Sequence, residues 1–165
     1  MIEPILKRRS IRQYTDEPVS EEQIGKLLEA GMAAPSASNK KPWHFVVVTE
    51  REKLDKLSHY GSHWDMLRDA PLSIIICGDP AISDRYWVQD CSAATENILL
   101  AVTMMGLGAV WLGCHPNPDR VDPTKELLGI EDPVTPLAVL AIGHPAEEKE
   151  PRTQYDEERV HRNEW

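Results

Sequence analysis

The chain has 165 residues and a formal net charge of −9, with 41% hydrophobic and 27% charged residues. This composition is ordinary for one soluble domain that is large enough to bury its own core. The acidic balance argues against nucleic acid as a general partner, since that role needs a broad basic surface. No apolar run approaches the roughly 20 residues that span a bilayer. The opening residues, MIEP, lack the pattern of a signal sequence, so we expect a cytoplasmic location.

A basic cluster stands near the N-terminus, where residues 7–12 read KRRSIR. The planar fork of donors on arginine suits phosphate, and the hydroxyl of Ser10 adds a neutral donor. An isolated cluster of this kind equally fits a solvated or ion-paired helix end. The rest of the chain has to decide between these two interpretations.

The next elements follow from capping and periodicity. Ser20 and Gln23 form a capping box ahead of apolar residues at helical spacing, which predicts a helix over 21–32 that ends before Pro35. Apolar runs predict strands over 44–49 and 72–77, with a short helix over 53–58 between them. The second strand lacks polar alternation, so both of its faces should be covered.

The longest predicted helix covers residues 86–105. Its apolar positions extend over more than one face, as in helices packed between a sheet and another surface. A third strand over 109–113, a short helix over 118–128 and a fourth strand over 137–143 follow. The alternation of helices and strands, taken alone, suggests a parallel α/β sheet.

The last segment, 146–165, is polar and charged, with Tyr155, Val160 and Trp165 as widely separated apolar residues. Its composition fits a disordered tail. The aromatic residues favour an arm that packs on another surface, such as a second subunit.

Cysteine and histidine give weak signals. Three cysteines at wide spacing do not form a disulfide framework, and Cys114 beside His115 is a poor candidate for a catalytic thiol. His59 and His63 have the spacing of a metal pair, but Gly61 interrupts them and no third ligand is evident. No glycine-rich dinucleotide loop or Walker motif occurs.

Three segments together resemble the FMN-dependent nitroreductase family, in particular its short single-domain members. They are RRSIR at 8–12, APSASNKKPWHF at 34–45, and GLGAVWLG at 106–113 with Asp90 and Asn97 on the helix before it. The ending YDEERVH at 155–161 is also similar. The resemblance spans essentially the whole chain, with order and spacing intact.

The resemblance implies an α+β fold with a mostly antiparallel sheet around a long central helix. It also implies an intertwined homodimer with two FMN sites at the interface, in which residues 1–165 form one domain and 146–165 an arm on the partner. The implied activity passes hydride from NADH or NADPH through flavin N5 to a small electron-poor acceptor, such as a nitroaromatic or a quinone. We expect no side-chain nucleophile or essential general base, because the flavin carries the chemistry.

The N-terminal segment supplies most of the implied flavin contacts. Arg8 corresponds to a phosphate ligand, while Arg9 and Ser10 correspond to contacts along the ribityl chain and the pyrimidine. Arg12 corresponds to the cation near N1 and O2, where positive charge raises the flavin potential.

Other implied contacts come from distant segments. Pro35, Ser36 and Asn39 belong to a loop that reaches the partner's flavin, although Lys41 stands where many members have glutamine. The remaining implied contacts are backbone donors near N5 and two further phosphate cations: Leu112, Gly113, Lys149 and Arg152.

Alternatives remain at this point. The same fold dehalogenates iodinated aromatics or fragments flavin in relatives of this family. A protein that binds or stores FMN without turnover is a third possibility, and an acidic dimeric scaffold that binds some other phosphate is a fourth.

Overall fold

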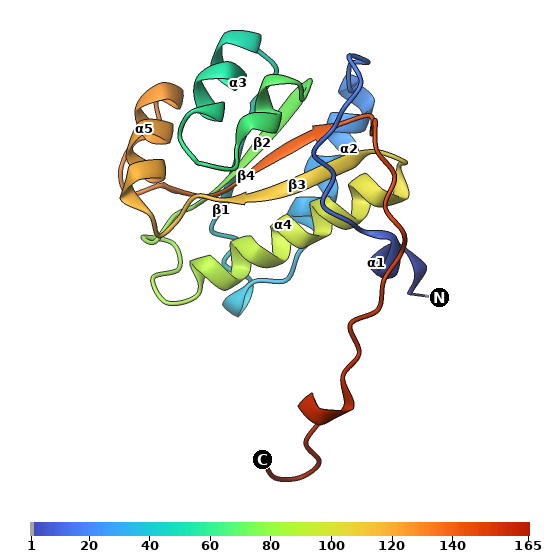
Figure 1. Cartoon of the computed structure of the whole chain (residues 1–165). Coiled ribbons are helices and arrows are strands. Elements are labelled where there is room, and N and C mark those ends of the chain that lie inside the picture. Colours follow the sequence, from blue (N-terminus) through green and yellow to red (C-terminus); the bar gives the residue numbers. More distant parts are fainter. Residues whose placement is uncertain (1) are drawn as a thin grey trace.

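The computed structural model describes residues 2–165. Its core is a single antiparallel sheet between two layers of helices (Figure 1). The strands are β1 (Trp43–Val48), β2 (Leu72–Gly78), β3 (Gly108–Gly113) and β4 (Thr135–Gly143). Their order is β1-β2-β4-β3, so β1 and β3 form the two edges.

The antiparallel α+β architecture confirms the fold class implied by the resemblance and corrects the parallel sheet suggested by alternation. β2 and β3 do run in the same direction, as strands joined by one long helix usually do. They are not neighbours, however, because β4 inserts between them and pairs antiparallel with both. β1 also pairs antiparallel with β2, so every pair of neighbouring strands in the sheet is antiparallel.

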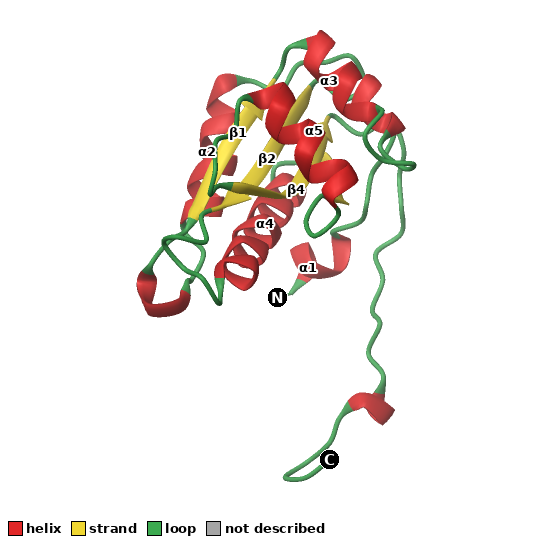
Figure 2. Ribbon diagram, turned by 90° about the vertical axis from the view of Figure 1, so that its left-hand side faces the viewer, coloured by secondary structure: helices red, strands yellow, loops and turns green. Residues whose placement is uncertain are grey.

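Helices cover both faces of the sheet (Figures 1 and 2). α2 (Glu21–Met32) and α4 (Trp87–Met104) pack on one face, against alternate β2 residues such as Ile74 and Ile76. α3 (Arg51–Ser58), the short 3-10 helix η2 (Asp65–Arg68) and α5 (Pro118–Leu128) pack on the other, against Ile75 and Cys77. Every residue of β2 is consequently buried, as its uninterrupted apolar run predicts.

The predicted helices over 21–32 and 118–128 coincide with α2 and α5, and the other predicted elements begin and end within two residues of those observed. Four short helices were not predicted: η2, α1 (Glu3–Lys7), η1 (Ala37–Asn39) and η3 (Glu157–Arg159). Within residues 2–165, no helix combines the length and apolar character that crossing a membrane requires.

After β4 the chain passes α1 and leaves the body of the domain (Figure 1). The amide of Arg152 still donates to the carbonyl of Leu6, at 3.2 Å. Beyond this contact the apolar side chains of the segment lie in solvent, with Tyr155 71% and Trp165 99% exposed. The ring of Trp165 stacks on His161 of the same segment.

Candidate functional site

The basic N-terminal segment lies along the outer edge of β3. The amide of Ile11 donates to the carbonyl of Ala109 at 2.9 Å, and Ser10 forms a parallel bridge with Ala109. Gly108 allows this approach, because a Cβ there would lie 2.7 Å from Cγ2 of Ile11. The backbone of the segment is thus fixed to the sheet.

The C-terminal chain joins this segment from the other side. Lys149 Nζ donates to the carbonyl of Ser10 at 2.6 Å and lies 3.2 Å from the carboxylate of Glu147. Arg9 donates to the carbonyl of Glu150. The amide of Arg12 donates to Glu147 Oε1 and is the main cause of the lowered pKa of that carboxyl.

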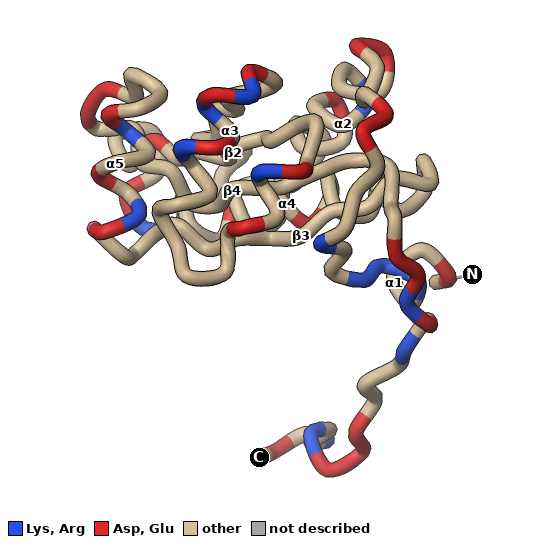
Figure 3. Tube along the Cα trace, turned by 45° about the horizontal axis from the view of Figure 1, so that its top comes forward, with Lys and Arg blue, Asp and Glu red and all other residues tan. Residues whose placement is uncertain are grey.

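Arg8 and Arg152 complete the basic end of the site. Both line a cavity of about 250 Å³, and Arg8 Nε lies 3.5 Å from Glu96 of α4. Figure 3 shows this concentration of Lys and Arg beside α1, with the acidic C-terminal chain adjoining it. The structure thus gathers at one end of β3 five predicted site residues from the two ends of the sequence: Arg8, Arg9, Ser10, Lys149 and Arg152.

The backbone of β3 alternates between its neighbour and the open edge. Because the carbonyl of Ala109 accepts from Ile11, it points away from β4, and alternation places the backbone groups of Trp111 and Gly113 on the same outer side. The backbone groups of Leu112 point toward β4 instead. Gly113 therefore offers an amide at the open edge, and Leu112 contributes its side chain.

A second cavity, of about 150 Å³, lies at the far end of this edge. It is lined by Arg12, Leu112 and Gly113, which the sequence predicts, and by His63 and Arg120, which it does not. His63 lies just before η2 and Arg120 lies in the first turn of α5. No sequence motif connects these residues, because only the folding of η2 and α5 over one face brings them to β3.

The loop with Pro35, Ser36 and Asn39 lies at the opposite edge of the sheet, beside β1. Its Ala37 amide donates to the buried carboxylate of Asp90 near the start of α4, at 2.8 Å. Three strand spacings, about 14 Å, separate β1 from β3. A single chain therefore leaves these residues on a different edge from the N-terminal segment.

Cys114 and His115 do not form a thiol–imidazole pair. The thiol of Cys114 faces Thr124 Oγ1 at 3.9 Å, and burial raises its pKa to about 11, so it stays protonated at neutral pH. The His115 ring packs edge-on against Trp87, with centroids 4.8 Å apart, and burial lowers the pKa of His115. This environment is typical of a structural cysteine.

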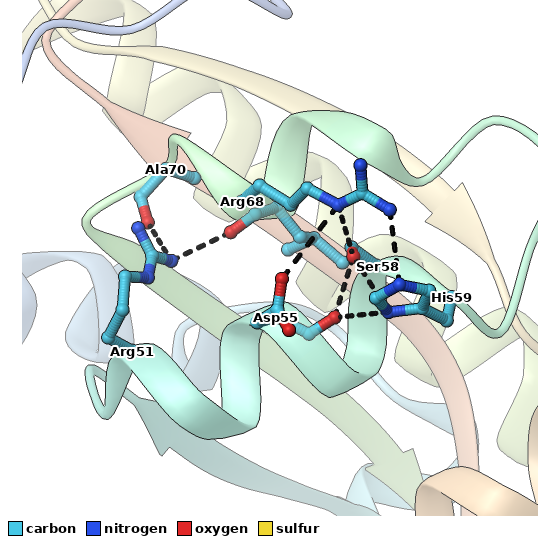
Figure 4. A network of polar contacts seen from close by, with 7 residues as sticks. Arg51, Asp55, Ser58, His59, Arg68 and Ala70 are labelled. Carbon is cyan, nitrogen blue, oxygen red and sulfur yellow. Dashed lines mark hydrogen bonds and ion pairs between the residues drawn. The ribbon is translucent and has the colours of Figure 1, made fainter.

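His59 belongs to a polar network that holds η2 on α3 (Figure 4). Its Nδ1 lies 2.8 Å from the carbonyl of Asp55 and its Nε2 lies 3.1 Å from Nη2 of Arg68. In the same network Arg51 donates to the carbonyls of Leu67 and Ala70. No group of three metal-ligating side chains occurs within residues 2–165.

Comparisons with known proteins agree with this geometry. A family model described as the Nitroreductase family matches residues 5–61 and 55–144. A protein of Archaeoglobus fulgidus, provisionally named NADH dehydrogenase/NAD(P)H nitroreductase, is 46% identical over 98% of this chain and 96% of its own length.

Solved structures extend the similarity to the fold. A crystal structure from Parabacteroides distasonis, with the same provisional name, has a TM-score of 0.97 at 42% identity and covers 99% of this chain and 98% of that one. An FMN-dependent nitroreductase from Clostridium difficile has a TM-score of 0.95 at 32% identity and covers both chains completely. The chain belongs to the Nitroreductase family.

Proposed function

We propose that this protein is an FMN-dependent oxidoreductase that passes hydride from NADH or NADPH to a small electron-poor acceptor, such as a nitroaromatic or a quinone. The main support is the position of the N-terminal segment, which runs along the open edge of β3 and carries Arg8, Arg9, Ser10 and Arg12. The names of the similar proteins, NAD(P)H nitroreductase and FMN-dependent nitroreductase, agree with this assignment.

The donor set along β3 fits FMN from end to end. A phosphate needs cations, and Arg8, Arg9, Lys149 and Arg152 stand at the basic end. The polar edge of the flavin ring needs hydrogen-bond donors and positive charge. Arg12 lines the cavity at the far end of β3, and the amide of Gly113 points to the same open edge of the strand. Such a concentration of cations in a chain of net charge −9 favours an anionic ligand.

Bound FMN would supply the ring that accepts and then gives up hydride, and the protein would supply orientation and electrostatics. Arg12 would hold positive charge at the pyrimidine edge, and Gly113 would donate its amide near N5. Leu112 would line the same cavity with its side chain. The protonated Cys114 thiol leaves the site without a cysteine nucleophile, as hydride chemistry on a flavin requires none.

The functional unit in this proposal is a homodimer with two FMN sites, in which residues 1–165 form one domain. Pro35, Ser36 and Asn39 of one subunit would complete the flavin site of the other, since their own β3 edge lies three strands away. Segment 146–165 would be an arm on the partner, which explains the exposure of Tyr155 and Trp165 in the single chain.

The deciding experiment is a visible absorption spectrum of the purified protein before and after anaerobic addition of NADH or NADPH. Flavin bands that bleach, and return when a nitroaromatic or quinone is added, support the reductase. Bands that persist favour a protein that binds FMN without turnover. Bleaching followed by loss of iodide from an iodinated aromatic, or by breakdown of the flavin, supports the alternative reactions of this fold. A protein that contains no flavin and cannot be reconstituted contradicts the proposal.

A further inference from the structure

Arg120 occupies an unusual position for a cation. It lies in the first turn of α5, where Asn117 caps the helix and Pro118 occupies the first position. Positive charge at a helix N-terminus interacts unfavourably with the helix dipole, so the helix gives no reason for an arginine there. The side chain instead reaches back to β3, where Nη1 donates to the carbonyl of Gly113 at 2.8 Å.

The guanidinium of Arg120 has a second fixed support. Its Cζ lies 5.9 Å from the ring centre of Trp64, within the range of a cation–π contact. Trp64 is 2% exposed and packs so closely on Gly61 that a Cβ there would lie 2.6 Å from the indole. Trp64 directly precedes η2, and the polar network of Figure 4 holds η2 on α3. Arg120 is thus held at β3 by a hydrogen bond and by its contact with the buried ring of Trp64.

The cavity next to Arg120 carries only positive or neutral side chains. Arg12, His63 and Arg120 line it, and none of its lining residues is acidic. Among residues 2–165, neither Arg12 nor Arg120 forms an ion pair within 4.0 Å. Two arginines from distant parts of the chain therefore line one small cavity whose lining contains no acidic residue, an arrangement that favours negative charge in the cavity.

We propose that Arg120 is a second cation of the flavin site, which holds Gly113 by its outer carbonyl and adds positive charge to the cavity of Arg12. The inference rests on the function proposed above. Arg120 acts as a positioning residue: it fixes the end of β3 so that the amide of Gly113 stays directed at the open edge. Its charge adds to that of Arg12 and favours electrons on the bound ring.

The test compares the flavin-loaded wild type with Arg120→Gln, Arg120→Lys and Arg12→Gln. Arg85→Gln is the matched control, because Arg85 is exposed and lies beside Asp84, away from this cavity. The midpoint potential is measured against redox dyes and the FMN Kd by fluorescence titration. Arg120→Gln should make the potential more negative and raise the FMN Kd by about tenfold, because the cavity loses a positive charge and Gly113 loses its support. Arg120→Lys should recover part of the potential, since it keeps the charge.

Several results would overturn the inference. An Arg120→Gln protein that has the wild-type potential and FMN Kd, even with a lower melting temperature, would leave Arg120 a purely structural role. An Arg120→Lys potential no higher than that of Arg120→Gln would remove the contribution of charge. If Arg120→Gln does not fold, Arg120→Lys decides the question. Its midpoint potential must then be more negative than that of the wild type, by less than the shift that Arg12→Gln causes.

These outcomes are distinct from failure of the proposed function. A wild-type protein that binds no FMN would refute that function and this inference together. If the wild type binds FMN and is bleached by NAD(P)H, but the Arg120 variants have the wild-type potential and FMN Kd, only the inference is refuted.

Discussion

The carboxylate of Asp90 accepts a 2.8 Å hydrogen bond from the amide of Ala37, which ties the loop at the β1 edge to the start of α4. Its other oxygen lies 3.4 Å from the hydroxyl of Ser83. Asp90 is 5% exposed, so removing it leaves the hydroxyl of buried Ser83 and the amide of half-buried Ala37 without a partner.

Asp90→Ala should therefore lower the free energy of unfolding by about 1–3 kcal/mol, measured by urea denaturation. In the proposed dimer it should also weaken FMN binding, because the loosened loop belongs to the partner's site. Gln89→Ala, on the exposed side of the same helix, is the control and should change neither quantity. Equal stability of both variants would contradict the role of Asp90 in holding the loop.

The contact between the N-terminal segment and β3 can be tested by replacing Gly108, with Gly25 as the matched control. Gly108→Ala should destabilise the protein by about 1–3 kcal/mol, because the new Cβ would lie 2.7 Å from Ile11 and push the segment off the strand. In Gly25→Ala the new Cβ lies on the exposed face of α2 with nothing within 4 Å, and the protein should become more stable by about 0.5–1 kcal/mol. Urea denaturation of both variants tests the pair, and a stable Gly108→Ala protein would refute the close contact.

Gly113→Ala separates ligand approach from folding. A Cβ at this position meets nothing within 4 Å in the single chain, so the melting temperature should stay within a few degrees of the wild type. A flat ligand held against the strand would meet the new methyl group, and the FMN Kd should rise by about tenfold or more. An unchanged Kd, measured by fluorescence titration, would place the flavin away from Gly113.

The three buried thiols predict a loss of stability in alkali. Burial raises the pKa of Cys77 and Cys91 from 9.0 to about 12 and that of Cys114 to about 11. Above pH 9 the unfolded chain releases these protons while the folded chain keeps them, so the unfolded state is favoured as pH rises. The contribution is complete below pH 9 and is lost as the pH rises through the folded-state values.

Each ionising thiol should lower the free energy of unfolding by about 1.4 kcal/mol per pH unit in this range. Urea denaturation between about pH 8 and pH 10.5 measures the slope. Cys91→Ala removes one of these thiols and should lower the slope by up to about 1.4 kcal/mol per pH unit, whatever its effect on stability at neutral pH. Equal slopes for the variant and the wild type would show that Cys91 ionises in the folded protein.

The C-terminal segment gives the prediction for assembly. Ending the chain after Gln154 keeps the contact of Arg152 with Leu6 and removes Tyr155, Val160 and Trp165. The proposed dimer should then dissociate at least about tenfold more readily in sedimentation velocity, because buried aromatic residues dominate interface energies. Trp165→Ala should reproduce part of the effect and Asn163→Ala none. A full chain that sediments as a monomer would contradict the dimer itself.

Local signals in the sequence predicted most of the elements. The capping box of Ser20 and Gln23 is present as predicted, and it fixes the first turn of α2. α1 was missed because it has five residues and no side-chain cap, so neither periodicity nor capping identifies it. The sheet order could not be read from local pattern either, since it depends on where β4 inserts.

The candidate site divides in the same way. Arg8, Arg9, Ser10 and Arg12 are recognisable as a run of neighbouring residues. Arg120 has no such signal, because a single arginine in a polar helix is usually a solvated side chain. Its relation to Gly113 depends on the packing of η2 and α5 over β3, which only the folded structure reveals.

The contacts between the two ends of the chain also set an order of assembly during synthesis. Residues 9–12 are synthesised 135 to 141 residues before their partners Glu147, Lys149 and Glu150. At about 5–20 residues per second, the first segment waits many seconds for its partners. The basic end of β3 is therefore incomplete until residues 147–150 have been made, and a ligand that needs both segments can be bound only after that.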